Sequence, residues 1–538
     1  MPLSTWLSAD SHAGRRWVTG AFFGLLALLG LGLFRDYGVS WDESNNHLNG
    51  LVNLKYLASF LPESFAIRHH PTFATTPDIH TFRDAHHGPV FEMSVVILSY
   101  LFTDHDSRSY FLTRHLLVFS VFLLGIWALY RVGTHWFRDW RWGLLTALLL
   151  VLTPRFFAEG FYNGKDIVYL ACFTLAMYTL LRLLERPTLQ RAAVHGLATA
   201  LAIVIRVHGV QLFLFTALGL LLAYRGPAAP PPRQLLRAGG LYLLVAVGGV
   251  LVGWPYLWAH SWPELLAVSS HAVRYPWPLT NLYLGQLLPV SKLPWHYIPV
   301  WILITIPLPY TLAAVAGMVV AARQSLAQPF QLTSTGRTAI LVALWLLGPM
   351  TLVMITYTVV YEGWRHLYYI YPALLLWAVQ GVRWLCRLGQ YAGPRRVVSR
   401  VLLAAALLET GHTALRMVQL HPFQNMYFSF LPGPVAERLF ERDYWGLSYR
   451  RGLEWILAHD SAKVVTVDTH LHFPLYNNLL VLRPTDRVRL RYLPDSSRYY
   501  LAAYRWHPQS YLDSVGTEVH TVRAGDITLL SIFRRPGR

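Results

Sequence analysis

Long apolar runs separated by short polar connections make up most of this chain as far as about residue 417. A run of about 17 to 25 apolar residues has the length at which an α-helix crosses a bilayer. The pattern therefore predicts about eleven spanning helices, near residues 17–35, 112–131, 142–157, 167–184, 192–206, 209–224, 238–258, 296–320, 338–358, 366–384 and 400–417.

One further apolar run, GPVFEMSVVILSYLF at residues 88–102, differs from the others in length and charge. It is too short to cross a bilayer comfortably, and it contains Glu92. We interpret it as an interfacial or re-entrant helix within a large first loop, residues 36–111.

The last part of the chain has short alternating segments instead of long apolar runs. KVVTVDTH, RVRLRYL, RYYLAAYR and ITLLSIF are typical of strands, and YRRGLEWILAHD is typical of a helix. The predicted fold is an α-helical polytopic membrane protein, residues 1–417, whose large first outer loop carries interfacial helices. A small C-terminal α/β domain, residues 418–538, follows it.

Composition agrees with a membrane protein. Hydrophobic residues make up 54% of the chain, charged residues 14%, and the mean hydropathy is +0.35. The formal net charge is +18. The arginines lie in short clusters between apolar runs and not along one basic face, so we expect no nucleic acid partner. Cys172 and Cys386 lie in or beside apolar runs, so no disulfide framework is expected.

The arginine clusters predict the orientation of the chain. Connections that face the cytoplasm are enriched in Lys and Arg. With a cytoplasmic N-terminus, the connections on that side carry 18 arginines, whereas the short connections on the other side carry six lysines or arginines. The sequence therefore predicts a cytoplasmic N-terminus, an uncleaved first span and an extracytoplasmic C-terminal domain.

With this orientation, acidic residues stand out in the first two outer loops. Asp42 and Glu43 follow the first span in SWDE, and adjacent side chains of this kind point in different directions. The pair is either a site or two solvated loop acids. Asp166 follows Lys165 in YNGKDIVYL, and it is either a site residue or an acid favoured by the dipole at a helix start.

Basic residues also occur in the later outer loops. Arg206 lies in a tight turn, RVHG, where a charge so near hydrocarbon is costly without a partner. Arg365 in YEGWRH either binds phosphate or anchors the chain at the membrane surface. Lys165 and Lys292 are weaker candidates for phosphate binding. Candidate substrate-binding residues near these motifs are His86, His87, Tyr361 and His366.

Five histidines crowd the first loop, and because His is a common metal ligand, a metal site is one interpretation. Their spacing fits no familiar zinc pattern. We therefore interpret them as surface, interfacial or substrate-contacting residues, namely His69, His70, His80, His86 and His87.

The order of these elements resembles the GT-C superfamily of membrane glycosyltransferases. The similarity is greatest to bacterial family 39-like enzymes related to protein O-mannosyltransferases and lipid A aminoarabinose transferase. It covers the chain to about residue 417: a first span, a large outer loop opening with an acidic pair, an acid after PRFF, and a late outer arginine motif.

The resemblance implies an inverting glycosyltransferase in the bacterial cytoplasmic (inner) membrane. Such an enzyme moves a sugar from a polyprenyl-phosphate donor to a hydroxyl of a lipid, glycan or protein acceptor at the outer face. Asp42 would be the base, Glu43 would orient the site, and Asp166 would position the acceptor or a metal. The donor phosphate would be bound by Arg206, Arg365, Lys165 and Lys292.

The resemblance has a gap that bears on cofactors. Some relatives carry a fuller acidic motif in the second loop, whereas NGKD offers one carboxylate beside a lysine. We therefore expect no cofactor and do not favour a divalent metal.

Two other functions fit a polytopic protein. A transporter or flippase for a lipid-linked or anionic substrate would carry ionisable groups near the bilayer midplane. A non-catalytic assembly subunit would tolerate neutral substitutions at Asp42, Asp166 and Arg365.

Overall fold

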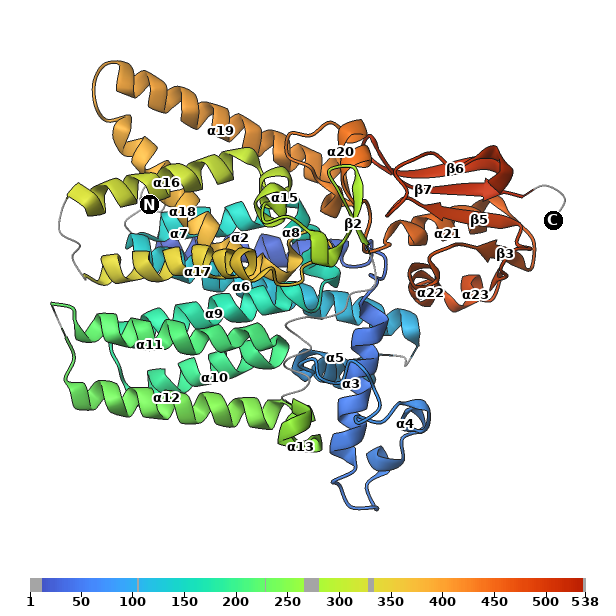
Figure 1. The fold of residues 1–538 in the computed structure, drawn as a ribbon, viewed down its shortest axis with the longest axis horizontal. Helices are drawn as coiled ribbons and strands as arrows, with labels where there is room; N and C mark the ends of the chain where they lie inside the picture. Colours follow the sequence, from blue (N-terminus) through green and yellow to red (C-terminus); the bar gives the residue numbers. More distant parts are fainter. Residues whose placement is uncertain (1–11, 104–105, 228, 266–279, 328–332, 536–538) are drawn as a thin grey trace.

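The computed structural model describes residues 12–103, 106–227, 229–265, 280–327 and 333–535. An elongated helical bundle occupies one end, and a small mixed sheet with its helices occupies the other (Figure 1). The bundle helices are α2 (His12–Leu33), α6 (Ser107–Phe137), α7 (Trp140–Val151), α8 (Pro154–Tyr162), α9 (Asp166–Glu185), α10 (Leu189–Ile205), α11 (Gln211–Tyr224), α12 (Pro232–Gly253), α15 (Tyr297–Thr305), α16 (Leu308–Ala327), α17 (Ser334–Thr356), α18 (Tyr371–Leu388) and α19 (Pro394–Gln419).

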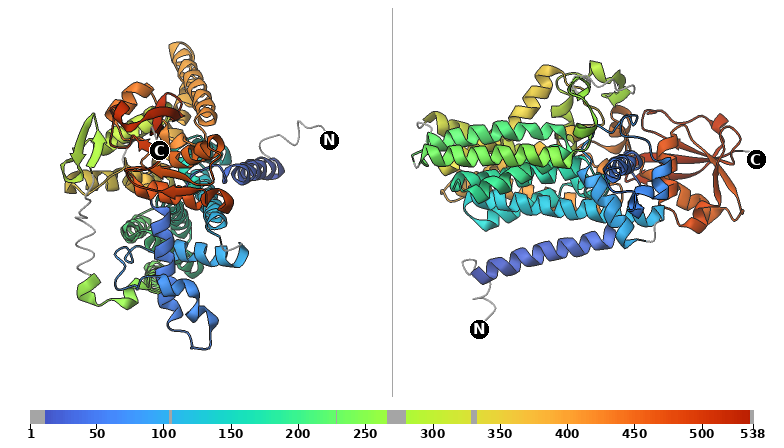
Figure 2. Two further views of the ribbon diagram at one scale, coloured as in Figure 1. Left: turned by 90° about the vertical axis from the view of Figure 1, so that its right-hand side faces the viewer. Right: turned by 90° about the horizontal axis from the view of Figure 1, so that it is seen from below.

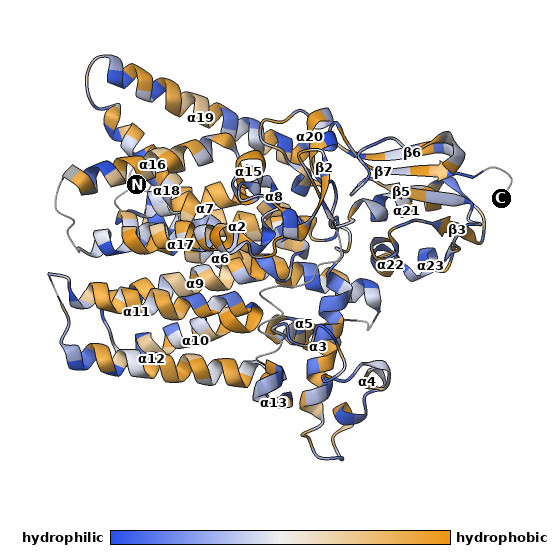
Figure 3. Ribbon diagram, viewed as in Figure 1, coloured by the Kyte–Doolittle hydropathy of each residue, from blue (hydrophilic) through white to orange (hydrophobic). Residues whose placement is uncertain are grey.

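The apolar residues of these helices make the bundle suited to a membrane (Figure 3). Among the described residues, seven helices are long and apolar enough to cross a bilayer, or eight if α7 and α8 form one bent span. Each of the predicted spans coincides with helical residues, but α10 and α15 are short, so fewer than eleven meet the length and composition of a full span. α2 packs against α6 at the edge of the bundle (Figure 2).

Two predicted spans are broken at prolines. The run 142–157 divides into α7 and α8, which meet at 73°, and the run 296–320 divides into α15 and α16. Proline disfavours helical backbone in the residue before it. Accordingly, Thr153 before Pro154 has ψ 105° and Ile306 before Pro307 has ψ 141°. The predictions of continuous helices there are wrong.

The first large loop forms helices that cross the bundle direction. α3 (Glu43–Ala58) and α5 (Val90–Phe102) run roughly perpendicular to the bundle helices and pack against each other (Figure 1). A Cβ on Gly50 of α3 would lie 2.9 Å from the backbone of Glu92, so the two helices approach closely only because this residue is glycine. η1 (Ala66–His69) and α4 (Pro71–Thr75) complete the loop.

The predicted outer loops gather at the end of the bundle that faces the sheet (Figures 1 and 2). Residues 266–279 of the fourth of these loops, with Arg274, lie outside the described residues. The described elements in these loops are η2 (Val207–Val210), α13 (Tyr256–Ala259), the antiparallel pair β1 (Thr280–Tyr283) and β2 (Gln286–Pro289), η3 (Val290–Lys292) and η4 (Arg365–Ile370). The last residues of α11 and α16 and the first residues of α12 and α17 lie at the opposite end, and the cytoplasmic location of that end stays a prediction.

After α19 the chain forms η5 (Gln424–Met426), α20 (Gly433–Leu439) and then a mixed sheet of order β4-β3-β5-β7-β6. β3 is parallel to β4 and β5, and the remaining pairs are antiparallel. β6 was not predicted; the four predicted strands and the predicted helix coincide with the other strands and α21. The bounds are α21 (Ser448–His459), β3 (Val465–Asp468), α22 (His472–Leu480), α23 (Pro484–Arg487), β4 (Leu490–Tyr492), β5 (Tyr499–Ala503), η6 (Asp513–Val515), β6 (Thr517–Ala524) and β7 (Ile527–Arg534).

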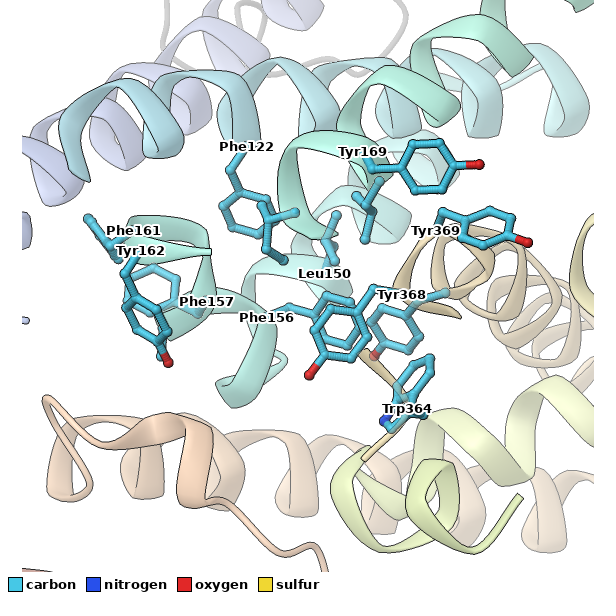
Figure 4. Packing of buried hydrophobic residues seen from close by; sticks show 14 of the residues in the cluster. Phe122, Leu150, Phe156, Phe157, Phe161, Tyr162, Tyr169, Trp364, Tyr368 and Tyr369 are labelled. Carbon is cyan, nitrogen blue, oxygen red and sulfur yellow. The ribbon is translucent and has the colours of Figure 1, made fainter. Parts of the chain in front are cut away.

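One hydrophobic core runs from the bundle into the sheet. Its centre is rich in aromatic rings of α8 and η4, where Phe156 stacks 4.3 Å from Tyr371 and contacts Tyr368 and Trp364 (Figure 4). Every residue of α8 is buried. The loops that carry the candidate site residues therefore rest on a closely packed aromatic layer.

Candidate active site

Asp42, Asp166 and Arg365 meet at the sheet-facing end of the bundle although they are far apart in the sequence. The Nη1 atom of Arg365 lies 3.1 Å from Oδ2 of Asp42 and 3.2 Å from Oδ2 of Asp166. The side chains of Asp166 and Arg365 are 1% and 4% exposed, whereas that of Asp42 is 30% exposed. Asp42 is therefore the carboxylate of this cluster that a bound molecule can reach.

Asp166 is positioned by the turn that begins α9. Its backbone N–H donates to Oδ1 of Asn163 (2.8 Å), and Nδ2 of Asn163 donates to Oδ2 of Asp166 (3.0 Å). The other carboxylate oxygen of Asp166 forms an ion pair with Arg206, which ends α10 in an extended conformation. Asp166 is thus held between two guanidinium groups, those of Arg206 and Arg365.

Lys165 supplies a further positive charge beside Asp42. Its side chain is half-buried, and within the described chain its ammonium group has no hydrogen bond or ion pair. Burial raises the pKa of Asp42, but the charges of Arg365, Lys165 and Arg206 outweigh it, so this pKa lies below its usual value. Asp42 is therefore ionised at neutral pH, and the cations around it can also attract a phosphate.

Neutral histidines border these cations. Burial, and then the charges of Lys165, Arg206 and Arg365, lower the pKa of His87 and His366 well below the usual value. His86 lies 4.3 Å from His87 between ring centroids, and its pKa is also lowered, mainly by burial. A neutral imidazole can donate and accept one hydrogen bond each, which suits a sugar hydroxyl.

Tyr361 packs between the arginine and one of the histidines. The guanidinium carbon of Arg365 lies 5.2 Å from the ring centroid of Tyr361, and the ring of His366 meets Tyr361 edge-on at 4.6 Å. Trp445 lies on the guanidinium of Arg365 as well, at 5.0 Å. These rings restrict the orientation of Arg365.

Glu43 lies away from this cluster. It is fully buried, its Oε1 accepts the backbone N–H of Ser40 (2.7 Å), and its Oε2 lies 3.3 Å from Nε of Arg114 and 3.1 Å from Nε2 of His115. Arg114 also forms an ion pair with Glu92 of α5. Glu43 therefore connects the start of α3 to α6 and α5, in contact with none of the cations beside Asp42.

Lys292 is not brought to the cluster. It is exposed at the end of η3, and in the described part of the chain it has no hydrogen bond or ion pair with another residue.

Sequence reasoning missed a chain of buried ionisable groups behind Arg365. Nη2 of Arg365 lies 2.6 Å from Oε2 of Glu362, whose other oxygen contacts Nη2 of Arg505. Nε of Arg505 lies 3.8 Å from Oε1 of Glu441, which also accepts a hydrogen bond from Trp506 (3.0 Å). All four ionisable side chains are at most 4% exposed. Glu362 was visible in YEGWRH, but no sequence signal marked Arg505 or Glu441.

Glu362 also has an uncommon backbone conformation. Its φ is +57° and that of Gly363 is +73°. A left-handed conformation costs a non-glycine residue free energy and persists only where the surroundings impose it. The two ion pairs of Glu362 provide such surroundings.

The part of the chain after α19 covers the segment that carries Asp42. The N–H of Trp41 donates to the carbonyl of Trp445 (2.9 Å), and the guanidinium of Arg505 lies over the ring of Trp41 at 4.9 Å. Asn477 donates to the carbonyls of Ser40 (2.8 Å) and Trp41 (3.1 Å). Residues from both ends of the chain therefore build one site.

The carboxylates do not form a metal-binding group. Among the described residues, no set of three or more His, Cys, Asp or Glu side chains is arranged to hold a metal ion. Asp42 and Asp166 instead face one guanidinium.

Residues 86–258 match a family model, that of dolichyl-phosphate-mannose-protein mannosyltransferase. This segment includes His86, Lys165, Asp166 and Arg206, and it excludes Asp42 and Arg365. No curated protein matches the chain in sequence.

One solved structure shares the fold of this chain over nearly its whole length. ArnT from Cupriavidus metallidurans bound to undecaprenyl phosphate is 13% identical, with a TM-score of 0.50 over 97% of this chain and 98% of that one. The Archaeoglobus fulgidus oligosaccharyltransferase in the apo form is 12% identical, with a TM-score of 0.48 over 87% of this chain. This chain spans 64% of the length of that oligosaccharyltransferase.

Proposed function

We propose that this chain is a GT-C membrane glycosyltransferase that transfers a sugar from a polyprenyl-phosphate donor to a hydroxyl group. The match of residues 86–258 to a mannosyltransferase family model and the shared fold support this proposal. The acceptor is a lipid, glycan or protein at the outer face of the cytoplasmic membrane. The observation that carries this proposal is the shared contact of Asp42 and Asp166 with Arg365 beside the unpaired Lys165.

In the proposed reaction the acceptor oxygen attacks the anomeric carbon of the donor. The bond between that carbon and the phosphate oxygen breaks, and its electron pair leaves with polyprenyl phosphate. The acceptor proton passes to the carboxylate of Asp42, and attack from the opposite face inverts the anomeric centre. A phosphate leaving group needs little protonation, so one carboxylate base suffices.

The cations have two tasks in this scheme. Arg365, Arg206 and Lys165 bind the donor phosphate and stabilise the negative charge that develops as it leaves. A phosphate on Arg365 also competes with Asp42 for Nη1, the atom that Asp42 contacts at 3.1 Å. Release from this ion pair raises the pKa of Asp42 and makes it a stronger base when donor is bound.

The remaining residues support this chemistry. Asp166, between Arg206 and Arg365, orients both guanidinium groups. His86, His87, His366 and Tyr361 border the cations and bind sugar hydroxyls. Glu43 holds the start of α3 in place through Arg114 and His115.

The direct test is Asp42→Asn in purified, folded protein. Transfer from polyprenyl-phosphate sugars, read by mass spectrometry of the products, is expected to fall by about 10²–10⁴-fold, the range for losing a general base. Glu63→Gln is a matched control, because Glu63 is an exposed acid in the same loop with a 72% exposed side chain. Full activity of Asp42→Asn would exclude this mechanism. Flux of an anionic substrate without transfer would indicate a transporter instead.

A further inference from the structure

A polar cavity lies where α6 begins, beside α21 and α23. Its volume is about 410 Å³, and its charged lining consists of Arg108, Arg450, Arg483, Arg489, Glu454 and Asp486. Arg108 is at the start of α6, which contacts α22, and the other residues come from α21 and the segment around α23 (Figure 1). None of these residues contacts Asp42, Asp166 or Arg365 within the described chain.

Backbone carbonyls hold three of the four guanidinium groups in place. Nη1 of Arg108 donates to the carbonyl of Val481 (2.8 Å), and Nη1 of Arg450 donates to those of Arg35 (2.6 Å) and Tyr37 (2.7 Å). Arg489 donates to carbonyls at the end of α21 and beyond. These bonds orient the arginines without neutralising their charge.

The cavity carries more positive than negative charge. Four arginines face two carboxylates, and one of these, Glu454, is shared between Nε of Arg450 (2.9 Å) and Nη1 of Arg451 (3.1 Å). Arg483 is exposed, and in the described part of the chain its guanidinium has no acceptor. Donors without protein acceptors therefore remain available at the cavity.

The surroundings place this cavity near the surface of the membrane. The last residues of α5, which precede α6, are large and exposed: Tyr100 is 54% exposed, Leu101 63% and Phe102 77%. Exposed apolar and aromatic residues of this kind face lipid at the boundary between hydrocarbon and headgroups. Arg108 follows them by a few residues, so we expect the cavity to lie at headgroup level.

We propose that this cavity binds a phosphate group, carried by an anionic lipid headgroup or present as free phosphate. Planar guanidinium groups match the geometry of phosphate oxygens and bind them with paired hydrogen bonds. The cavity has the size of a small-molecule site. This proposal is independent of sugar transfer, since it uses none of the residues around Asp42.

The test measures phosphate binding by the full-length protein in nanodiscs. One arm titrates inorganic phosphate into nanodiscs of phosphatidylcholine. The other counts phosphatidylglycerol molecules retained by native mass spectrometry. Binding of inorganic phosphate without phosphatidylglycerol identifies a free phosphate site. Retained phosphatidylglycerol that millimolar phosphate does not displace identifies a lipid headgroup site.

Arg483→Gln is the principal variant, because Arg483 is exposed and the substitution breaks no hydrogen bond or ion pair in the described part of the chain. We expect binding to weaken about five- to tenfold, and further in Arg108→Gln/Arg483→Gln. Arg491→Gln is the matched control, since Arg491 is an exposed arginine on β4 of the same domain, outside the cavity lining. Because both variants keep the residues around Arg365, the difference between them excludes the contribution of any phosphate bound there. Equal binding by Arg483→Gln and Arg491→Gln, or no anion binding by the wild type, would overturn the proposal.

Discussion

Asp42 and Glu43 are neighbours in the sequence, yet their carboxylates lie in different environments. Asp42 contacts Arg365 and is partly exposed, whereas Glu43 is buried against Arg114 and His115. The acids and arginines of the outer loops could be selected from the sequence because all of them were predicted to lie on the same side of the membrane. The pairing of Glu362 with Arg505 could not be predicted from the sequence. These residues are 143 positions apart, and their contact depends on how the segment after α19 packs against the bundle.

At the same scale, Lys165→Met tests the unpaired cation. Removing one charge-assisted hydrogen bond to the donor phosphate is expected to weaken donor affinity roughly 10- to 100-fold, measured as KM or by direct binding. The melting temperature should change little, because no ion pair in the described chain is lost. Lys292→Met is the control, since Lys292 is exposed on η3. Equal effects of the two substitutions would remove Lys165 from the phosphate site.

Glu441→Gln tests a buried carboxyl group next to Arg505. Burial raises the pKa of Glu441 to about 8, and Arg505 and Trp506 only partly oppose this shift. A group with a raised pKa in the folded state stabilises it at low pH, and this stability is lost as pH rises from about 4.3, the unfolded value, to about 8. The melting temperature of Glu441→Gln minus that of the wild type should therefore increase over this interval and level off above it. A difference independent of pH would show that Glu441 stays ionised.

At the scale of elements, prolines decide where the apolar runs break into separate helices, and glycines decide where segments pack closely together. The apolar runs correctly located the helices, because the length and apolar composition of a segment are enough to indicate a spanning helix. They did not reveal that α8 turns by 73° into the protein, which follows from the backbone at Thr153 and Pro154. The sequence did not predict β6 because most of TEVHTVRA is exposed or half-buried and lacks a clear apolar pattern. This segment is a strand because it pairs with β7.

The substitution Gly88→Ala tests the close contact between the first loop and α10. A Cβ at this position would lie 1.8 Å from the carbonyl oxygen of Val204, near Arg206. Gly88→Ala is expected to destabilise the fold by about 1–3 kcal/mol and to lower transfer, because the loop with His86 and His87 must move away from Arg206.

The control for this substitution is Gly20→Ala in α2, where a Cβ would meet nothing within 4 Å. Thermal unfolding followed by tryptophan fluorescence, with a transfer assay, compares the two. An unchanged melting temperature of Gly88→Ala would contradict the close approach.

At the scale of the whole molecule, the residues after α19 contribute directly to the candidate site. The hydrophobic core is continuous from the bundle into the sheet, and Arg505 reaches Glu362 and the ring of Trp41. The sequence indicated a separate domain after residue 417 because the apolar runs stop there. It could not show docking, which depends on contacts between distant residues.

Arg505→Met tests this docking as a positioning effect on Arg365. Without Arg505, we expect Glu362 to move toward Arg365 and to change the position of its guanidinium group. This change should lower kcat more than it raises KM. Arg505→Lys should restore part of the lost activity. Breaking a buried ion pair also costs about 3–5 kcal/mol of stability. Arg498→Met is the control, because Arg498 pairs with Asp460 (3.1 Å) in the same domain away from Glu362. Equal loss of activity in both variants would indicate general destabilisation.

The position of Arg505 and Asn477 near the end of the chain has a consequence for biosynthesis. Trp41 and Asp42 leave the ribosome early, whereas the residues that cover them are translated last. At about 5–20 residues per second, roughly 25–100 s pass before Arg505 is made. Until then, the contacts of Asn477 and Arg505 with Ser40 and Trp41 cannot form. A chain truncated by a premature stop before the sheet would carry Asp42 without the residues that cover its neighbour Trp41, so we expect such a product to lack the geometry of the candidate site.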